Sequence, residues 1–530
     1  MLALLLSLFV AAAPAEGVDT VVVCPAEFRA ALAPWVEHRQ AQGHRLAFVD
    51  NRGGADEIRA AIRRLAAGGA LRFVVLVGDA DPAAATDARV AARSVPTHLA
   101  KARVNVHFGS DAQIATDNWY ADLDDDALPD VAIGRLSADS PEELSRMVTK
   151  ILRYEQAALP GRWRRQINLV AGVGGFGGMI DSVIEMSTKK FLTEGIPAAY
   201  RTSMTYGSWQ SSYCPDPRRF HDVTVRRLNE GCLFWVYIGH GHPEQLDRVR
   251  TPAGGFHILD VGDAGKLRCE SGSPIAIMLA CYTGAFDRER DCLSEEMLRA
   301  ESGPVAVLSG SRVTMPYAMS VMGSEMLRQY FQERRPTIGE VLLHAKREMV
   351  KPLGTKEAGG PRQWLDLLAA TFSPRADLLD EERAEHVLLF NLLGDPLLRV
   401  AYPETVELAT KSAARAGERI EISGECPIGG RLLVELVCRR DCTRQPAVQR
   451  TAFARTGEEL SAFDRFYDEA NNPQWTKREF RFEGGKFRVE LDVPDDAYGP
   501  CHVCAEVVSD KRYALGAADV FIRRAATAAE

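Results

Sequence analysis

Short apolar runs alternate with amphipathic stretches over the first third of the chain. The runs include TVVVCP near residue 20, RLAFVD near residue 45 and RFVVLVGDAD near residue 72. Between them, apolar positions recur at intervals of three and four residues, which predicts one helix ending at Gln42 and a second over about Ala55–Ala67. Because strands alternate with helices, we expect a mostly parallel sheet over residues 18–160.

The pattern starts again after the break at Pro160-Gly161 and changes after Pro403. A second α/β unit is predicted over residues 161–401, where QINLVAGV, CLFWVYIG, PIAIMLAC and PVAVLSG are the buried strands. Beyond it, short alternating runs such as RIEISG, LLVELVC, KFRVELDV and ADVFIRR predict an antiparallel β-sandwich over residues 402–530. The fold class is therefore α/β followed by an all-β domain.

Composition and charge narrow the class of protein. The 530 residues are 46% hydrophobic and 26% charged, which is typical of a folded globular chain with more than one domain. The formal net charge of −8, without a dense Lys/Arg stripe, argues against nucleic acid as a partner. No pattern in the sequence predicts an oligomeric state.

The first fifteen residues, MLALLLSLFVAAAPA, form an apolar run that ends in a small-x-small cleavage pattern. The run is too short to span a bilayer, and no later segment reaches the roughly 18 apolar residues of a membrane helix. We therefore expect residues 1–15 to be a signal peptide and the protein to be exported to the periplasm, the cell surface or the medium. An uncleaved anchor or a buried helix is the alternative.

Eleven cysteines make an odd set, so that in an oxidising compartment at least one thiol stays free or pairs with another molecule. Five of them gather near the C-terminus, where C-x3-C and C-x2-C spacings suit either disulfides or zinc. Export favours disulfides. These five are Cys426, Cys438, Cys442, Cys501 and Cys504.

Two apolar strands end in side chains that can react. LFWVYIG runs into His240-Gly241, and IAIMLA runs into Cys281. Because the carboxyl ends of parallel strands open on a common crevice, adjacent strands would bring the imidazole and the thiol together as a proton shuttle and a nucleophile. The amides of Gly241 and Cys281 would then be placed to stabilise an oxyanion.

Each residue also has a structural reading. A single buried cysteine is usually a small core residue, and a single histidine is usually a polar group with its hydrogen bonds satisfied. His242 competes with His240 for the acid/base role, but only His240 follows the strand directly. The matched positions of His240 and Cys281 favour the catalytic reading.

The pairs His240-Gly241 and Ala280-Cys281 resemble the signature of the caspase-like clan of cysteine peptidases. Longer stretches resemble the gingipain-type family within it: VVLVGD, DNWYADLDDDALPDVAIGRL, YIGHG, LACYTGAF, GPVAVLSGS and NLLGDPLL. The resemblance implies a caspase-like catalytic unit of two subdomains followed by an immunoglobulin-like domain. It also implies an endopeptidase in which Cys281 attacks the peptide carbonyl, His240 protonates the leaving amine and Gly241 lines the oxyanion hole.

Two positions bear on orientation and specificity. The family has an acidic residue near the histidine, after a strand resembling NLVAGVGG, whereas this chain has Val173 there. Asp181 stands near the place of the acid that selects basic P1 residues in Arg-specific members, although an Asp at a helix start is also a common N-cap. The catalytic pattern begins soon after the apolar leader, so we expect activity to be controlled differently from relatives with a long inhibitory propeptide.

An acidic loop carries alternate carboxylates at Asp122, Asp124 and Asp126, followed by Asp130. Such oxygens suit a hard cation, and the resembled family binds calcium. The loop is not an EF-hand, because Ala127 replaces the turn glycine and Ile133 stands where the bidentate Glu would be. A structural calcium ion and a solvated acidic turn are the two readings.

The expected function is hydrolysis of protein or peptide substrates through a thioester acyl-enzyme, with no cofactor needed for the chemistry. Sortase-like transpeptidation, in which an amine accepts the acyl group, is the enzymatic alternative. A non-catalytic binding protein on the same fold is the third hypothesis, and Val173 in place of the expected acid favours it.

Overall fold

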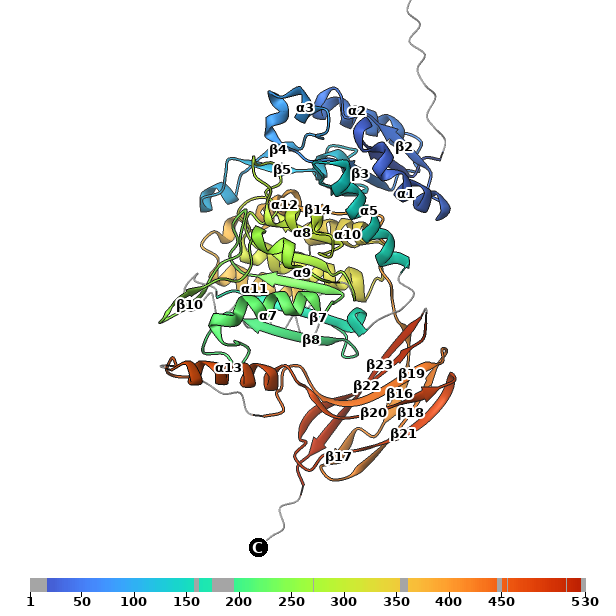
Figure 1. Cartoon of the computed structure of the whole chain (residues 1–530), viewed down its shortest axis with the longest axis vertical. Coiled ribbons are helices and arrows are strands. Elements are labelled where there is room, and N and C mark those ends of the chain that lie inside the picture. Colours follow the sequence, from blue (N-terminus) through green and yellow to red (C-terminus); the bar gives the residue numbers. More distant parts are fainter. Residues whose placement is uncertain are drawn as a thin grey trace, which may run out of the picture.

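The computed structural model describes residues 17–156, 162–173, 195–269, 271–352, 361–445, 450–454, 456–510 and 512–525. The predicted signal peptide and Asp181 lie outside these residues. Along the long axis of the molecule, an N-terminal α/β region, a central α/β region and a C-terminal β region follow one another (Figure 1).

One ten-stranded sheet runs through both α/β regions in the order β2-β1-β3-β6-β14-β13-β12-β9-β7-β8. Neighbouring strands are parallel except at β13 and β14, which are antiparallel. The sheet therefore consists of two parallel halves that point in opposite directions. The strands are β1 (Thr20–Val23), β2 (Leu46–Val49), β3 (Phe73–Val77), β6 (Ala132–Leu136), β7 (Gln166–Ala171), β8 (Arg201–Tyr206), β9 (Phe234–Ile238), β12 (Ile275–Leu279), β13 (Ala306–Gly310) and β14 (Phe390–Leu393).

The predicted parallel sheet is confirmed, and its continuity is a finding. β14, which comes from the region 161–401, pairs in parallel with β6 of the region 18–160. The strands are apolar on both faces because helices cover both. The helices of the α/β part are α1 (Arg29–Ala41), α2 (Gly54–Ala66), α3 (Ala88–Ala91), α4 (Asn118–Ala121), α5 (Pro141–Gln156), α7 (Phe220–Asn229), α8 (Leu293–Arg299), α9 (Pro316–Phe331), α10 (Ile338–Val350), α11 (Pro361–Phe372) and α12 (Leu379–Leu389).

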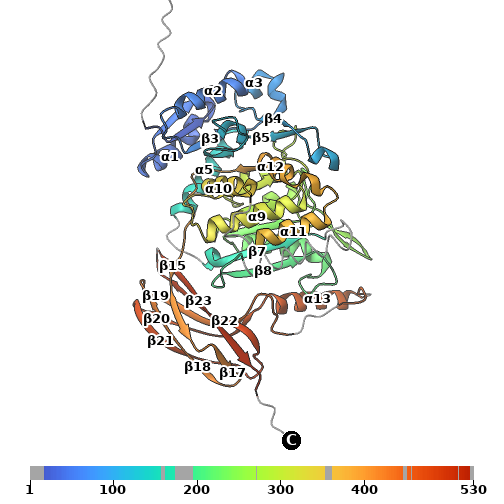
Figure 2. The same ribbon diagram turned by 180° about the vertical axis from the view of Figure 1, so that it is seen from behind.

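The two faces have separate helix layers. In the N-terminal half, Trp35 of α1 and Phe28 just before it share a core with Val75 of β3. On the other face of the sheet, Ile58 of α2 packs with Val74 of β3. In the central half, α7 and α8 lie in front of the sheet in Figure 1, and α9, α10 and α11 lie in front of it in the reverse view of Figure 2. Successive side chains of a strand point to opposite faces of the sheet, so each strand contributes to both helix layers. The smaller pairs β4 (His98–Lys101) with β5 (Gln113–Thr116) and β10 (Val249–Thr251) with β11 (Gly254–Phe256) are antiparallel.

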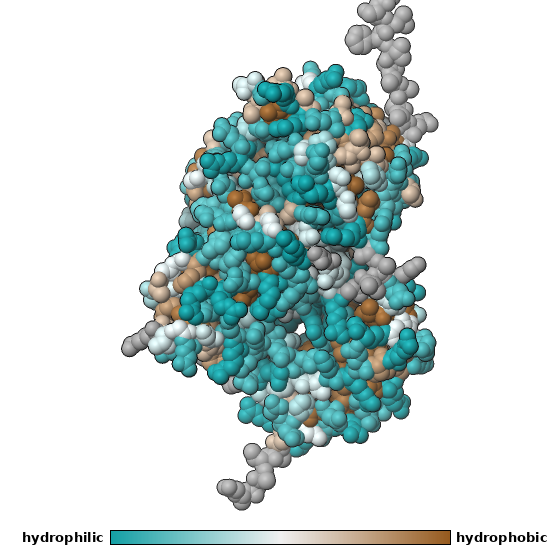
Figure 3. Space-filling view, viewed as in Figure 1, coloured by the Kyte–Doolittle hydropathy of each residue, from teal (hydrophilic) through white to brown (hydrophobic). Residues whose placement is uncertain are grey.

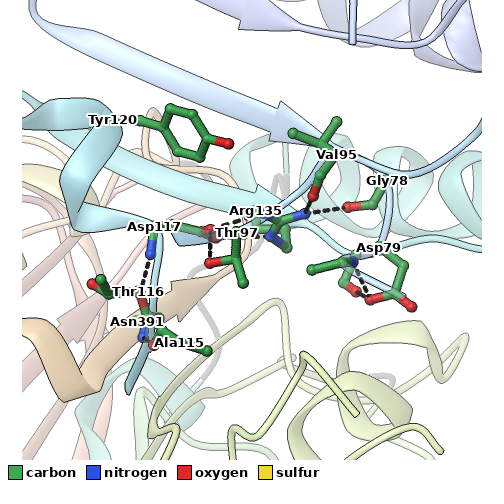
Figure 4. Close-up of polar contacts among 12 residues, drawn as sticks. Gly78, Asp79, Val95, Thr97, Ala115, Thr116, Asp117, Tyr120, Arg135 and Asn391 are labelled. Atoms are coloured by element: carbon green, nitrogen blue, oxygen red, sulfur yellow. Dashed lines mark hydrogen bonds and ion pairs between the residues drawn. The ribbon is translucent and has the colours of Figure 1, made fainter. Parts of the chain in front are cut away.

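A buried ion pair lies beside the junction of β6 and β14 (Figure 4). Arg135 of β6 donates from Nε and Nη2 to the two carboxylate oxygens of Asp117, each at 2.7 Å. Its Nη1 donates to the carbonyls of Gly78 and Val95 at 2.9 and 2.8 Å. The Asp117 amide donates to Oδ1 of Asn391 on β14 at 2.9 Å. Since both charges are buried and well hydrogen-bonded, this network fixes the junction of β6 and β14.

The C-terminal region is built from a six-stranded and a three-stranded sheet, with orders β15-β23-β22-β19-β20 (β17 pairs with β23) and β16-β18-β21. Ile420 and Val489 of the smaller sheet share a core with Leu432 and Val503 of the larger one, so the two sheets pack against one another. The strands are β15 (Glu404–Thr405), β16 (Glu407–Thr410), β17 (Ala413–Arg415), β18 (Arg419–Cys426), β19 (Gly430–Cys438), β20 (Gln474–Phe482), β21 (Gly485–Asp492), β22 (Gly499–Val508) and β23 (Tyr513–Arg523).

One helix, α13 (Gly457–Ala470), interrupts the predicted all-β pattern between β19 and β20. It lies against the β8 side of the α/β part (Figures 1 and 2), where the hydroxyls of Tyr467 and Thr205 are 2.8 Å apart. A buried ion pair of Arg165 with Glu435 of β19 adds a second contact. The C-terminal region is therefore attached through specific polar contacts.

All eleven cysteines are thiols in the structure. Cys438 and Cys501 lie directly opposite one another across β19 and β22. A disulfide or a metal site among the C-terminal cysteines stays a prediction, and this facing pair is where a disulfide would form.

The surface and the helices give no sign of a membrane span in the part of the chain that the structure describes. No helix there is long and apolar enough to cross a bilayer. Hydrophilic residues dominate the face shown in Figure 3, and the hydrophobic residues among them are scattered in small groups.

Candidate active site

The predicted proximity of His240 and Cys281 follows from strand register. β9 and β12 are adjacent and parallel, and Ile238 at the end of β9 pairs with Leu279 at the end of β12. His240 and Cys281 each lie two residues beyond this pair, at the same edge of the sheet. Neighbouring strands are about 4.8 Å apart, so the register brings the backbones of the two residues close together at this edge.

Cys281 lies in a tight turn, residues 280–284, which we call the Cys281 turn. Tyr282, the next residue, has φ of 58°, a left-handed conformation that is unusual for a side-chain-bearing residue and is often associated with functional sites. The Tyr282 amide donates to the Arg312 carbonyl at 3.0 Å, and the Gly284 amide donates to the Gly310 carbonyl at 3.0 Å. The loop that follows β13 therefore holds the turn in place.

The thiol is half-buried and is contacted by the same loop. The Thr314 amide lies 3.3 Å from Sγ of Cys281, at a distance suited to an N–H···S hydrogen bond. The Thr314 hydroxyl lies 3.7 Å from this sulfur. The sulfur also lies 3.6 Å from the Thr314 carbonyl oxygen, so the backbone of Thr314 contacts the thiol at two points.

His240 belongs to a loop, residues 239–247, which we call the His240 loop. Its carbonyl accepts hydrogen bonds from the Tyr237 hydroxyl at 2.8 Å and from the Asp247 amide at 3.1 Å. His240 is half-buried, whereas His242 is exposed and its amide donates to the Gln245 carbonyl at 2.8 Å. The backbone of His240 is thus fixed on two sides.

Gly241 lies directly against the Cys281 turn. A Cβ atom at this position would lie 2.6 Å from the Cys281 carbonyl oxygen and 2.7 Å from Cγ2 of Thr283. Only glycine permits this approach without displacing backbone. Within the described part of the chain, neither the Gly241 amide nor the Cys281 amide donates a hydrogen bond.

Three supporting residues were not predicted: Thr314, Arg312 and His386. Arg312 donates to both carboxylate oxygens of Asp287, at 2.8 and 2.5 Å, and its carbonyl holds the Cys281 turn. Arg312 and Thr314 follow β13, the strand next to β12. The strand-end rule that identified Cys281 could therefore have pointed to this loop as well.

His386, by contrast, is a buried support on α12. Its Nε2 accepts a hydrogen bond from the Met315 amide at 2.8 Å, so the proton is on Nδ1, which lies 2.7 Å from the Glu382 carbonyl. Burial lowers the pKa of His386 to about 4. The ring is neutral near pH 7, and it anchors the residue that follows Thr314.

Acidic residues near the histidine differ from the family pattern. Val173 lies two residues after β7, beside the end of β9. Asp247, which had not been predicted, is buried at the end of the His240 loop, and its Oδ2 has no hydrogen-bond partner among the described residues. The pKa of the Tyr237 hydroxyl is raised, mainly by burial and to a smaller extent by the negative charge of Asp247. Asp247 thus supplies a buried carboxylate to this loop, in a place different from that of the expected acid.

The acidic loop keeps three of its four predicted ligands together. Asp122, Asp124 and Asp130 each bring one carboxylate oxygen within 4.8 Å of the others. Asp126 is not in this group, and its Oδ1 accepts the Leu128 amide at 2.8 Å. Ala127 has φ of 67°, so the turn has the left-handed residue for which an EF-hand uses glycine.

The structure and the sequence point to the same relatives. The family model described as Peptidase family C25 matches residues 13–401, well over half of the chain. The chain belongs to peptidase family C25. Lys-gingipain of Porphyromonas gingivalis is 26% identical over 308 residues, which are 56% of this chain and 16% of that protein. Gingipain R2 of the same species is 24% identical over 250 residues, 45% of this chain and 32% of that protein.

Solved structures agree on the fold. The crystal structure of the Arg-specific cysteine proteinase gingipain R has a TM-score of 0.52 and 15% identity, covering 96% of this chain and 98% of its own. A protease of known structure has a TM-score of 0.53 and 16% identity, covering 95% and 97%. The large mixed sheet and these matches agree with a caspase-like α/β core. The region matched in the curated gingipains spans less than a third of their length.

Proposed function

We propose that this C25 chain is a cysteine endopeptidase that cleaves protein or peptide substrates, with Cys281 as nucleophile and His240 as general acid and base. The observation that carries the proposal is the pairing of Ile238 with Leu279, because it brings His240 and Cys281, two residues further on, to the same edge of the sheet. Membership of a peptidase family and the hydrogen bond from the Thr314 amide to the thiol sulfur support it.

In the proposed reaction the Cys281 thiol gives its proton to His240, and its sulfur attacks the carbonyl carbon of the scissile bond. The carbon–nitrogen bond breaks, and the amine leaves with a proton from His240. Water then attacks the thioester while His240 accepts a proton from it. The carbon–sulfur bond breaks, His240 returns the proton to the Cys281 sulfur, and the carboxylic product leaves. No cofactor enters these steps.

The carbonyl oxygen gains negative charge in each step. The Gly241 and Cys281 amides are available to donate to it, and the close packing of Gly241 on the Cys281 turn keeps them together. Removal of one such donor typically costs about 3 kcal/mol of transition-state stabilisation.

Digestion of a peptide library by the wild-type protein and by Cys281→Ala, under reducing conditions, tests the proposal. We expect internal cleavages that are absent from the variant. Product masses distinguish hydrolysis from transpeptidation, because an acceptor amine adds its own mass. A folded wild-type protein that cleaves no peptide, with every P1 residue represented, would refute the peptidase and favour a binding protein.

The substrate preference is assigned to Asp181 by resemblance alone, since this residue lies outside the described part of the chain. Cleavage restricted to sites after Arg or Lys, and lost in Asp181→Ala, would support a basic P1 pocket. An unchanged preference in that variant would remove the assignment.

A structural calcium ion is proposed for the acidic loop, on Asp122, Asp124 and Asp130. The clustering of their carboxylates and the left-handed Ala127 support it. Arg59 competes, since its Nη2 lies 3.4 Å from Oδ2 of Asp122. Calcium should raise the unfolding temperature of the wild-type protein but not of Asp124→Ala. An equal shift in both would argue for a solvated turn.

The finer architecture and the location of the protein are part of the proposal. We assign residues 18–160 and 161–401 to two caspase-like subdomains, and residues 402–530 to an immunoglobulin-like sandwich, which the two packed sheets support. The apolar residues 1–15 support export with removal of this segment. Sequencing of the mature N-terminus in cell fractions tests both cleavage and location.

A further inference from the structure

A second group of metal-ligand side chains lies outside the catalytic crevice. It contains His221 of α7, His257 after β11, and Asp263 of the short helix η6 (Val261–Lys266), and their ligand atoms all lie within 4.8 Å of one another. The Asp260 carboxylate, at the start of η6, joins them, with Oδ2 3.5 Å from Nε2 of His257. Asp263 is buried, whereas the other three are open to solvent on one side.

We propose that these four side chains form a structural zinc site. Zinc bonds of about 2.0–2.1 Å in tetrahedral geometry place neighbouring ligand atoms about 3.3 Å apart. Here Nε2 of His257 is 2.9 Å from Oδ2 of Asp263, and Nε2 of His221 is 3.5 Å from Oδ1 of the same carboxylate. His221, His257 and Asp263 would thus supply two nitrogens and one oxygen, and the Asp260 carboxylate, which lies 3.5 Å from His257 and outside the group of three, would move in as the fourth ligand.

The hydrogen bonds around the cluster prepare its ligands. Nδ1 of His221 lies 3.1 Å from the Ile258 carbonyl, so it carries the proton and Nε2 presents its lone pair to the cluster. Oδ1 of Asp260 accepts the Gly262 amide at 2.8 Å, which leaves Oδ2 directed to His257. Lys266 binds Oδ1 of Asp263 at 2.7 Å, but this lysine is 60% exposed and can move into solvent when a cation binds.

The site is connected to the His240 loop through backbone pairing. The Leu246 amide donates to the Leu259 carbonyl and the Val261 amide to the Glu244 carbonyl, each at 2.9 Å. Asp260 itself forms a β-bridge with Gln245. A metal bound to His257 and η6 would therefore stabilise the segment on which the His240 loop lies, without touching substrate.

Metal binding by the chelator-treated Cys281→Ala protein, in which the catalytic thiol cannot bind metal, tests the proposal. The probes are zinc chloride, measured by equilibrium dialysis, and cobalt chloride, measured by visible absorption. His221→Ala and His257→Ala remove single ligands. His502→Ala is the matched control, because it removes another histidine hydrogen-bonded to an aspartate, Asp519, at 2.8 Å.

We expect one zinc ion per chain and a cobalt spectrum typical of a tetrahedral site with nitrogen and oxygen ligands. The affinity for zinc should be at least 100-fold weaker in His221→Ala and His257→Ala. It should be unchanged in His502→Ala. Zinc should also raise the unfolding temperature only where the affinity is retained. Equal zinc binding in all variants, or a thiolate-to-cobalt charge-transfer band, would overturn the proposal. The readout does not depend on peptidase activity, so it stands or fails separately from the proposed function.

Discussion

Replacement of Gly241 by alanine tests how the His240 loop and the Cys281 turn are held together. The added Cβ would lie 2.6 Å from the Cys281 carbonyl oxygen, 2.7 Å from Cγ2 of Thr283 and 3.0 Å from Cβ of Ala280. All three atoms belong to the Cys281 turn, so the loop and the turn must separate by several tenths of an ångström. Overpacking of this kind costs about 1–3 kcal/mol of stability.

The effect on catalysis should be larger than the effect on folding. A displacement of about 1 Å between reacting groups lowers the rate about 100-fold, or about 2.7 kcal/mol of barrier. We therefore expect Gly241→Ala to reduce kcat/KM on a cleavable library peptide about 100-fold while the protein stays folded by circular dichroism. Gly265→Ala is the matched control, because a Cβ there meets nothing within 4 Å. Activity of Gly241→Ala within twofold of the wild type would refute the proposed packing.

Three further predictions concern residues that support the site. Burial lowers the pKa of His386 from about 6.5 to about 4, so between these pH values the unfolded chain binds a proton that the folded chain does not. About 3 kcal/mol of stability should therefore be lost as the pH falls from 6.5 to 4. Burial raises the pKa of the Glu382 carboxyl to about 7, which has the opposite effect on stability, so the difference in urea unfolding between the wild type and His386→Gln isolates the contribution of the histidine. Arg312→Ala leaves the Asp287 carboxylate unpaired and should lower the free energy of unfolding by about 3–5 kcal/mol. Arg288→Ala removes an exposed ion pair and should change the free energy of unfolding by less than about 1 kcal/mol. Equal effects in the two variants would contradict the prediction that the buried pair matters more. Asp247→Asn keeps the shape of the side chain but removes the buried negative charge. We therefore expect a changed pH profile of kcat/KM with little change in unfolding temperature. An unchanged pH profile would exclude an electrostatic role for Asp247 in catalysis.

The strand-end geometry was predictable because it depends on local pattern and one general rule. Apolar runs that end in His240 and Cys281 identify two buried parallel strands, and the carboxyl ends of adjacent strands meet. Gly241 was expected from the sequence only to line the oxyanion hole. In the structure a Cβ at this position would meet the Cys281 carbonyl oxygen, a long-range packing that no spacing along the chain reveals.

Other features depend on long-range contacts. The antiparallel pairing of β13 with β14, which unites both halves in one sheet, joins strands that only the folded chain brings together. Helix α13 has a capping box at Thr456 and Glu459 that a closer reading could have found, but the alternating runs around it favoured strands. His221 and His257 come from separate elements, so their convergence on Asp263 could not be predicted from sequence spacing.

Selective alkylation tests the central claim most directly. Burial raises the pKa of the other ten cysteine thiols, and among these only Cys442 is even half-exposed. The protein should be treated with limiting iodoacetamide while peptide cleavage and the modified sites are followed together by mass spectrometry. We predict that Cys281 is modified first and that activity falls in proportion to its modification. Full modification of Cys281 with cleavage activity retained would contradict the account.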